Sequence, residues 1–333
     1  MKRVKIIILL TIILFIVFFL TSFYSYVNTP LTLKEDKLFK VGKNETTAVI
    51  VENLVKEGII TNKIFFKFLI KIKGGDRNIV YGYYLIPKDI TPNGIWEKMI
   101  KGEVERYRFT VPEGYNIYQI AQILENQKMG DRKKFLSLVK DKKFIKTLGL
   151  DVPSLEGYLH PATYFFDPET KEEEIILAMV NKTFEVLKEL NISDKNPKEI
   201  HEILIKASLI EKEAKTKEEM PIISSVLANR LNKGMKLQFD PTVQYGLLRF
   251  DYNLTKKDLT TRNPYNTYIN YGLPPTPIAN PSKSAILAVL NPAQTDYLYF
   301  VAKNDGTHYF SSDLKKHNKA VYHYQIKGKK GEL

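Results

Sequence analysis

The chain has 333 residues, enough for two modest domains, and its 44% hydrophobic and 26% charged composition is that of an ordinary globular protein. It contains no cysteine, which excludes disulfides, thiolate metal sites, thiol nucleophiles and a lipid-modified cysteine anchor. The formal net charge of +13 comes mostly from lysines spread along the sequence, without the clustered basic and aromatic pattern of RNA-binding proteins, so we expect no nucleic acid partner.

The N-terminal segment has the pattern of a membrane-spanning helix. Three basic residues, Lys2, Arg3 and Lys5, precede an uncharged and mostly apolar run over residues 6–27. About 20 such residues cross the hydrocarbon core of a bilayer, and a basic flank favours the cytoplasmic side. We therefore predict a cytoplasmic tip and single-pass anchor in the cell membrane over residues 1–27, then a linker over residues 28–38, with the rest of the chain outside the cytoplasm.

The alternative for this segment is a cleaved signal peptide, which would have a shorter apolar run and an A-x-A-like cleavage site. The run instead ends on Thr21-Ser22-Phe23-Tyr24-Ser25-Tyr26. The rings of Tyr24 and Tyr26 suit the interface between lipid and water. An uncleaved anchor is the better interpretation.

Residues 39–150 contain a weak internal repeat. Phe39-Lys40-Val41 lines up with Phe109-Thr110-Val111, seventy residues later, and the equivalent apolar pairs that follow are Ile50 with Ile120, Leu54 with Leu124, and Phe65 with Phe135. Each copy reads as a strand, a turn containing a glycine, and an amphipathic helix. We predict a small strand–helix module, with a further strand over residues 81–86 and a short helix over residues 94–101 between the copies.

Residues 151–333 form the second predicted domain, and Pro153 opens a mainly helical part of it. We predict helices over residues 171–190 and 198–217, and a third from Met220 to about Gly234. From Leu237 onward, dense proline and asparagine predict long, shaped loops instead of regular elements. Strands over residues 297–302 and 307–310 are predicted to form a hairpin. The fold class is therefore α+β.

The segment Ala207-Ser208-Leu209-Ile210-Glu211-Lys212-Glu213 carries the candidate chemistry. At about 100° per residue, Ile203, Ala207, Ile210 and Ala214 form one apolar stripe, and Glu211 and Glu213 fall about 80° to either side of it. A carboxyl at the margin of a buried face has a raised pKa, which suits a proton donor near neutrality. Helix geometry cannot choose between the two glutamates, and both could instead be boundary residues paired with neighbouring lysines.

A series of motifs in residues 155–325 resembles the YceG-like family of endolytic lytic transglycosylases, the MltG type. The motifs are the 207–213 segment, Leu155-Glu156-Gly157-Tyr158-Leu159, Asn229-Arg230-Leu231, Leu237-Gln238, Asp240-Pro241-Thr242-Val243, Tyr265-Asn266-Thr267-Tyr268, Gly272-Leu273-Pro274-Pro275, Ile278-Ala279-Asn280-Pro281 and Tyr297-Leu298-Tyr299-Phe300-Val301-Ala302. They occur in the family's order, after an anchor and a module that also match its layout. No single motif is decisive, but chance does not produce so many in sequence.

The resemblance implies that Glu213, the second glutamate of the E-K-E segment, is catalytic, that residues 39–150 form a LysM-like module, and that residues 151–333 form a transglycosylase domain. The implied reaction is non-hydrolytic cleavage of the MurNAc-β-1,4-GlcNAc bond in peptidoglycan glycan strands, leaving 1,6-anhydro ends. No cofactor is required, and the five scattered histidines without an HExxH pair predict no metal site. Only the resemblance suggests wall-synthesis enzymes as partners.

Further polar residues of these motifs are predicted to shape a sugar-binding cleft, since amides and hydroxyls bond sugar groups directionally and tyrosine rings offer flat apolar faces. They are Glu156, Tyr158, Gln238, Asp240, Tyr245, Asn266, Thr267 and Tyr268. Each has a competing structural interpretation, such as Asp240 capping a turn before Pro241. Arg230 is either a substrate contact or a buried structural ion-pair partner.

The chain departs from the family pattern at three positions. Ala162 stands where the family often has aspartate, so an acidic contribution from that loop is not expected, and Asn263 and Ser282 replace an expected serine and glycine. Two other functions fit the same residues. One is a hydrolytic muramidase in which Asp240 or Glu156 activates water, and the other is a non-catalytic wall-binding scaffold anchored in the membrane.

Overall fold

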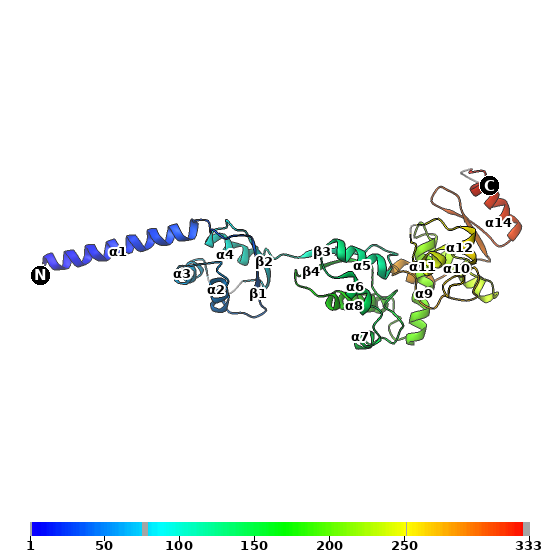
Figure 1. The fold of residues 1–333 in the computed structure, drawn as a ribbon, viewed down its shortest axis with the longest axis horizontal. Coiled ribbons are helices and arrows are strands. Elements are labelled where there is room, and N and C mark those ends of the chain that lie inside the picture. Colours follow the sequence, from blue (N-terminus) through cyan, green and yellow to red (C-terminus); the bar gives the residue numbers. More distant parts are fainter. Residues whose placement is uncertain (1, 75–78, 251, 329–333) are drawn as a thin grey trace. The chain divides into compact units, whose positions relative to one another are not determined.

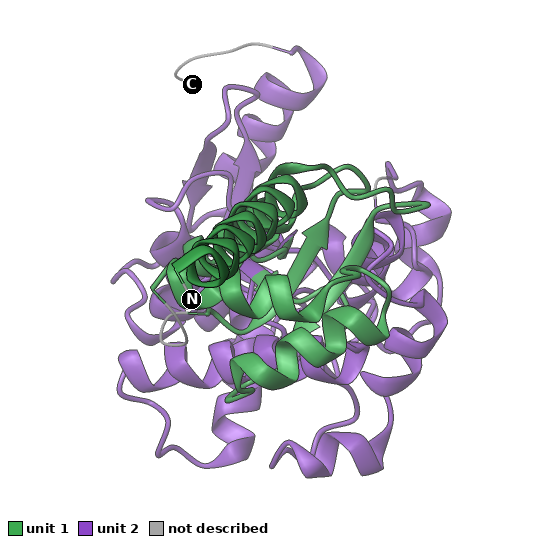
Figure 2. Ribbon diagram, turned by 90° about the vertical axis from the view of Figure 1, so that its left-hand side faces the viewer, with its two compact units in different colours: residues 1–107, 165–169 green, residues 108–164, 170–333 purple. Residues whose placement is uncertain are grey.

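A computed structural model describes residues 2–74, 79–250 and 252–328. The described chain combines helices with small antiparallel sheets, 50% helix and 8% strand, as the α+β prediction requires (Figure 1). It divides into two compact units, one of residues 1–107 with 165–169 and the other of residues 108–164 with 170–333 (Figure 2). The predicted ranges 39–150 and 151–333 remain a proposal, and the parts of them at residues 75–78, 251 and 329–333 lie outside the described residues.

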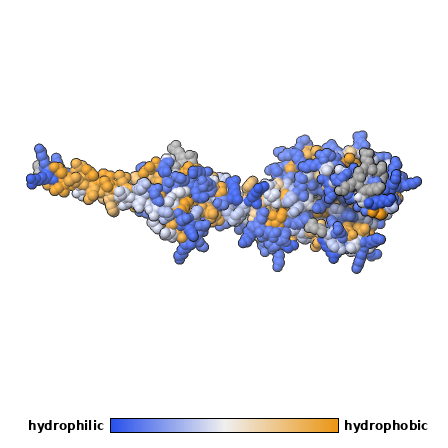
Figure 3. Space-filling model, turned by 90° about the horizontal axis from the view of Figure 1, so that it is seen from above, coloured by the Kyte–Doolittle hydropathy of each residue, from blue (hydrophilic) through white to orange (hydrophobic). Residues whose placement is uncertain are grey.

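The first helix, α1 (Lys2–Asn28), is long and apolar enough to cross a membrane. No residue in its most apolar stretch is buried by the described protein. Its surface is hydrophobic beyond a hydrophilic tip (Figure 3). The C-terminal end differs, because Val27 is buried and Phe23 and Tyr26 pack against the core of the first unit. The helix α1 therefore continues into the folded unit that follows it.

The first unit pairs β1 (Lys37–Val41) with β2 (Gly82–Ile86) in antiparallel register and packs three helices around them. The helices are α2 (Thr47–Lys56), α3 (Lys63–Ile72) and α4 (Pro92–Lys101). Each begins where a polar N-cap side chain, Thr46, Asn62 or Thr91, accepts a hydrogen bond from a backbone N–H of the first turn. The strand and short helix predicted over residues 81–86 and 94–101 are confirmed as β2 and α4.

The internal repeat is confirmed as a repeat of elements. The second copy consists of β3 (Tyr107–Thr110), α5 (Ile117–Asn126) and α6 (Arg132–Leu138), and its N-cap Asn116 stands where the first copy has Thr46. Ile120, Leu124 and Phe135 are fully buried. The copies differ at Phe65, which is partly exposed while the next residue, Phe66, fills the core. An additional helix, α7 (Lys142–Thr147), was not predicted.

The second unit combines a few long helices with shorter helices and strands. They are β4 (Thr163–Phe166), which pairs with β3, and then α8 (Glu172–Glu189), α9 (Pro197–Glu213), α10 (Met220–Asn232), α11 (Asp240–Leu247), α12 (Lys256–Thr260), α13 (Lys283–Leu290), β5 (Tyr299–Ala302), β6 (His308–Ser311), α14 (Leu314–Val321) and a π-helical turn (Tyr322–Ile326). The helices predicted at 171–190 and 220–234 and the 297–310 hairpin are confirmed. The helix predicted over 198–217 ends four residues earlier, at Glu213.

The prediction of long loops after Leu237 is wrong for α11, α12 and α13. Pro241 lies in the first turn of α11, and Ser282 caps α13 directly after Pro281. Proline is compatible with the first turn of a helix, where its missing N–H would have no helical partner. The prolines therefore mark helix starts at these two places. Both helices pack against α9 and hold its last turn in the unit.

Candidate active site

A cavity of about 350 Å³ opens at the C-terminal end of α9 in the second unit. Its walls come from α9, α10, the segment leading into α11, the loop before α13, β5 and α14. The lining residues are Glu213, Arg230, Leu237, Gln238, Phe239, Asp240, Tyr268, Phe300 and His317. The fold thus brings Glu213 together with three of the eight predicted substrate contacts, Gln238, Asp240 and Tyr268.

Glu213 is the last residue of α9, because Ala214 takes an extended conformation. Leu209 and Ile210, one turn before it, are fully buried and fix this end of the helix in the core. The side chain is partly exposed, and within the described chain no residue donates a hydrogen bond to its carboxyl or forms an ion pair with it. The C-terminal end of a helix carries partial negative charge, which also disfavours a carboxylate there.

These surroundings keep Glu213 protonated near neutral pH. Burial raises the pKa of its carboxyl to about 8, and the negative charge of Asp240 adds to the rise, while Lys215 and Arg230 oppose it. A carboxylic acid with such a pKa can give a proton to a leaving group at neutral pH and then act as a base. Glu213 therefore has the properties of a general acid facing an open cavity.

Glu211 has a different environment, which separates the two glutamates that the helix pattern could not. Its carboxylate accepts hydrogen bonds from the backbone N–H of Ser282 at 2.9 Å and from the Ser282 hydroxyl at 2.6 Å. Burial raises its pKa, and both bonds from Ser282 oppose the rise. The serine that departs from the family pattern therefore joins α9 to the first turn of α13, and Glu211 has a structural role.

Glu156 is fully buried and is occupied by protein donors. It accepts hydrogen bonds from the backbone N–H of Ile117 at 3.2 Å, from the Tyr245 hydroxyl at 2.8 Å and from the Asn280 amide at 3.1 Å. Burial raises its pKa to about 8, against the effects of the Ile117 and Tyr245 bonds. These contacts connect the start of α5, the helix α11 and the loop before α13, away from the Glu213 cavity.

The other predicted contacts outside the cavity lining are also buried and bonded to protein. The Tyr158 hydroxyl forms a hydrogen bond with Nδ1 of His201. The Asn266 amide donates hydrogen bonds to the carbonyls of Leu259 and Thr261. Thr267 accepts the backbone N–H of Phe239 at 2.9 Å. Their prediction as substrate contacts stays untested, but in this structure Tyr158 contacts α9, and Asn266 and Thr267 hold segments that line the cavity.

Gln238, Asp240 and Tyr268 present polar groups to the cavity. Gln238 has a left-handed backbone, with φ of 56°, and its N–H donates to the Thr267 carbonyl. The Tyr268 hydroxyl donates a hydrogen bond to Asp240, and the backbone N–H of Tyr268 donates to the side chain of Asn266. Thr267 thus holds the backbone of Gln238, and Asn266 holds the backbone of Tyr268.

Arg230, whose role the sequence left open, is a buried structural cross-link that also lines the cavity. Its guanidinium donates to the backbone carbonyls of Leu237 and Leu298, each at 2.6 Å, and lies over the ring of Tyr299 at 5.4 Å. No carboxylate in the described parts of the chain forms an ion pair with it. Its positive charge lowers the pKa of Glu213, so it favours the carboxylate that remains after a proton is given up.

His317 was missed by the sequence reasoning. It lies on α14, lines the cavity and stacks on Tyr299, with ring centroids 5.2 Å apart and 25° between the ring planes. Its Nδ1 atom is buried and has no hydrogen-bond partner in the described chain. Burial lowers its pKa, and nearby Arg230 lowers it further, so the ring is neutral at pH 7. Only Asp313, the N-cap of α14, could have signalled this helix.

Known proteins match the chain over most of its length. The model of the YceG-like family matches residues 39–323. A protein of Bacillus subtilis (strain 168) named endolytic murein transglycosylase is 36% identical over 301 residues, covering 85% of this chain and 83% of its own. A protein of the same name from Streptococcus pneumoniae serotype 2 (strain D39 / NCTC 7466) is 30% identical over 334 residues, covering 88% of this chain, which spans 59% of that relative's length.

A solved structure is also similar. A crystal structure at 2.6 Å of a YceG-like protein from Listeria monocytogenes is 34% identical, with a TM-score of 0.56. The match covers 86% of this chain and 99% of that one. The likeness therefore extends through both units.

The different environments of Glu156 and Glu213 predict different effects of their substitution on stability. Glu156→Ala leaves the buried donors of Ile117 and Tyr245 without an acceptor and removes one of the two bonds of the Asn280 amide, and we expect it to lower the free energy of unfolding by about 2–5 kcal/mol. Glu213→Ala removes a sheltered carboxyl that accepts no bond from the described protein, so stability should be unchanged or slightly higher. Denaturant unfolding of the detergent-solubilised full chain measures both, and equal destabilisation by the two substitutions would contradict the assignment.

Proposed function

Because the chain belongs to the YceG-like family, we propose that it is an endolytic lytic transglycosylase that cleaves peptidoglycan glycan strands with Glu213. The observation that carries the proposal is the difference among three sheltered glutamates. Glu156 and Glu211 accept hydrogen bonds from protein donors, whereas Glu213 lines a cavity and burial raises its pKa. The names of the relatives from Bacillus and Streptococcus supply the substrate class, murein.

In the proposed reaction Glu213 serves twice. Its proton passes to the glycosidic oxygen as the bond from C1 of the muramyl sugar breaks, so GlcNAc leaves as an alcohol. The resulting carboxylate then takes the proton of the muramyl 6-hydroxyl as that oxygen bonds to C1 and closes the 1,6-anhydro ring. Acid and base roles fall to the same residue, so the second carboxylate of ordinary glycosidases is not needed.

Neighbouring charges support both halves of this cycle. Asp240 raises the pKa of Glu213 and adds negative charge near a sugar that becomes cationic in the transition state. Arg230 lowers the pKa of Glu213 and so stabilises the carboxylate that forms after Glu213 has given up its proton. Gln238, Tyr268 and His317 supply polar edges and an aromatic face to the sugar rings.

The main alternative is a hydrolytic muramidase, in which a second carboxylate activates water. Glu156 is a poor candidate because it is fully buried and bonded to protein donors. Asp240 is the better one, since it is exposed in the same cavity, although its carboxylate is engaged by Tyr268. The two reactions differ in their products by one water molecule.

We place the catalytic unit outside the cytoplasm. Lys2, Arg3 and Lys5 flank the apolar run of α1 on its N-terminal side, and positive flanks stay in the cytoplasm. This orientation puts both folded units on the side of the membrane where murein is assembled. The wall-synthesis enzymes that act there are proposed as partners.

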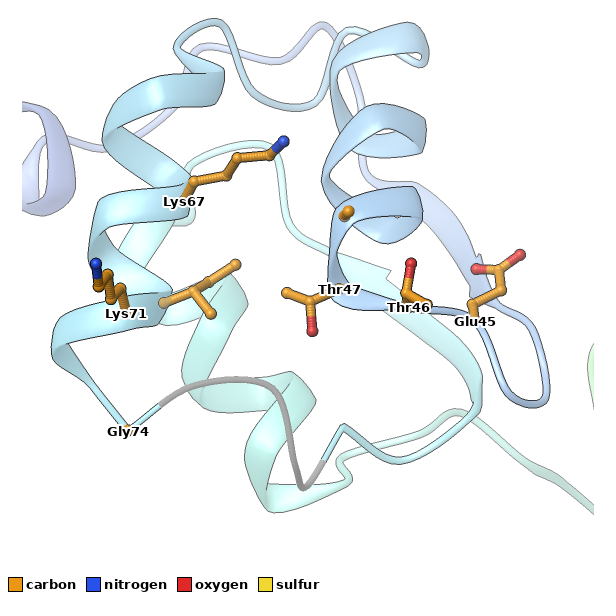
Figure 4. A pocket seen from close by; sticks show the side chains of 8 residues that line it. Glu45, Thr46, Thr47, Lys67, Lys71 and Gly74 are labelled. Carbon is orange, nitrogen blue, oxygen red and sulfur yellow. The ribbon is translucent and has the colours of Figure 1, made fainter.

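Residues 39–150 are proposed to be a LysM-like module that holds the glycan, with its groove in the first unit. In the order β1–α2–α3–β2, an open groove of about 1000 Å³ lies between the start of α2 and the C-terminal half of α3 (Figure 4). Thr46 and Thr47 lie on one side of this groove, and Lys67 and Lys71 on the other. Hydroxyls and ammonium groups around an open groove suit the hydroxyl and acetamido groups of a glycan.

The single-glutamate reaction predicts the effect of Glu213→Gln. Glutamine keeps the size of the side chain but can neither give nor take the proton, so cleavage should fall at least about 100-fold. Mass spectrometry of digested glycan strands should find 1,6-anhydromuramyl ends with wild type. Reducing ends that carry an added water would favour the muramidase instead, and full activity of folded Glu213→Gln protein would remove Glu213 from the reaction.

The charges around Glu213 predict shifts of the pH–rate profile. The acid must be protonated, so kcat/KM should fall by about tenfold per pH unit above the pKa of about 8. Asp240→Asn removes the charge that raises this pKa, so the fall should begin at lower pH. Lys215→Gln removes an opposing charge and should move it to higher pH. Profiles of both variants that coincide with wild type would show that another group limits the rate.

The place of His317 in the lining of the cavity predicts a role for this residue in substrate binding. His317→Phe keeps a flat ring against Tyr299 but removes both nitrogens, so we expect kcat/KM to fall about tenfold, equal to about 1.4 kcal/mol. The thermal midpoint should hold and the loss should lie in KM. An unchanged KM with a lower thermal midpoint would assign His317 to folding alone.

The proposed glycan-binding groove of the first unit can be tested by filling it with a larger side chain. Ala48 lines the groove and is exposed, so Ala48→Trp should fill it and weaken binding to purified sacculi about tenfold. The matched control is Val49→Trp, because Val49 is 42% exposed on the same helix but does not line the groove. Co-sedimentation in the Glu213→Gln background measures binding without cleavage, and equal binding by both variants would contradict the proposed groove.

A further inference from the structure

Helix α3 has two separate apolar faces. Phe66, Leu69 and Ile70 are buried in the core of the first unit. On the other side of the helix, Ile64, Phe65, Phe68 and Ile72 form a second apolar stripe at the three- and four-residue spacing of a helical face. Ile64 is 73% exposed and Ile72 is 59% exposed. A soluble domain needs only the first of these faces.

The second face meets the membrane-spanning helix. Phe65 lies edge-on to Phe19 of α1, with ring centroids 5.4 Å apart, and Phe68 lies 5.5 Å from the same ring. Both α3 rings also contact Phe23, at 5.8 and 4.9 Å. Edge-to-face aromatic contacts of this kind are specific in geometry, so they fix α3 against α1.

The position of Phe19 along α1 places these contacts at membrane depth. The last basic residue before the apolar run is Lys5, and about 20 residues from there cross the hydrocarbon core, which brings the far boundary to about Ser25. Phe19 lies six residues before that point, or about 9 Å inside the boundary at 1.5 Å per residue. Side chains of α3 that touch Phe19 therefore reach into the acyl region.

The basic residues of α3 lie on a third side of the helix. Lys63, Lys67 and Lys71 are spaced by four residues between the two apolar faces. Glu52 pairs with Lys63 and Lys67, while in the described part of the chain Lys71 has no carboxylate partner. Lysine stems can lie along apolar surface with the ammonium group at lipid phosphates.

We propose that α3 lies in the membrane interface beside α1, with Ile64, Phe65, Phe68 and Ile72 in the acyl layer and Lys71 at the headgroups. The occupant of the exposed face is lipid because this face contacts α1 at Phe19 and Phe23, and the most apolar stretch of α1 is not buried by any described part of the chain. The inference rests on α1 crossing the membrane and is independent of the proposed reaction.

This placement has a consequence for the groove of the first unit. Lys67, Ile70 and Lys71 of α3 also line that groove, so an α3 held in the interface fixes the groove at the level of the lipid headgroups. A glycan bound there would be one that is still close to the membrane. The second attachment also prevents the unit from swinging freely about the end of α1.

The absence of native cysteine makes a direct test possible, because one introduced cysteine is the only thiol. The full chain carrying Ile64→Cys or Ile72→Cys is labelled with an environment-sensitive fluorophore and reconstituted in phosphatidylethanolamine–phosphatidylglycerol vesicles. The control is Leu85→Cys, because Leu85 is also apolar and exposed but lies on β2 of the same unit. Carbonate extraction of the same vesicles checks separately that α1 is inserted.

Labels at positions 64 and 72 should emit at shorter wavelength than the label at 85. They should lose fluorescence with nitroxide-bearing acyl chains and resist iodide in the water, whereas the label at 85 should do the reverse. Quenching by iodide at 64 and 72 equal to that at 85 would overturn the proposal. Protection from both quenchers, lost when the vesicles are diluted to one chain each, would assign the face to a second copy and would also overturn it.

Discussion

The proposed chemistry depends on one carboxyl group that the protein shelters but does not bind. Glu213 sits where α9 ends, next to buried Leu209 and Ile210, and its carboxyl receives no hydrogen bond from the described residues. A carboxylate at that place would lose water without gaining donors, so the protonated form is favoured. The position of the helix end is therefore the reason that Glu213 keeps its proton at neutral pH, and the rest of the second unit holds that position.

The second unit is held in place by buried polar groups that form hydrogen bonds with other parts of the protein. Glu156 joins α5, α11 and the loop before α13, while Arg230 joins α10 to β5 and to the segment before α11. Thr267 holds the backbone of Phe239, next to Asp240. Buried polar groups with all partners in place make a rigid frame, whereas one missing partner is costly. These residues therefore have a structural role, whereas Glu213 is the proposed catalytic residue.

The sequence predicted the regular elements better than the site. Apolar residues at helical spacing, such as Ile120 and Leu124, were correctly placed in a core, and the repeat matched real elements down to the N-caps Thr46 and Asn116. The end of α9 at Glu213 was missed because Ala214 and the lysines after it favour helix locally, and tertiary packing decides otherwise. Proline-rich segments were misread because proline opens a helix as readily as it breaks one.

The site residues were harder to predict for a physical reason. Polar motif residues such as Glu156, Asn266 and Thr267 look the same in sequence whether they bind a ligand or a neighbouring loop, and only the folded partners distinguish the two. The choice between Glu211 and Glu213 needed Ser282, which lies far along the chain. His317 enters the cavity through α14, so no local pattern linked it to Glu213.

The bond between Tyr268 and Asp240 bears on whether water or the sugar itself attacks. A hydrolase needs its second carboxylate free to take a proton from water, and here the Tyr268 hydroxyl occupies one oxygen of Asp240. An attacking group that belongs to the substrate has a large entropic advantage over a free water molecule, since it is already held near C1. With Asp240 engaged and Glu213 free to accept the proton, the arrangement favours ring closure by the 6-hydroxyl over hydrolysis.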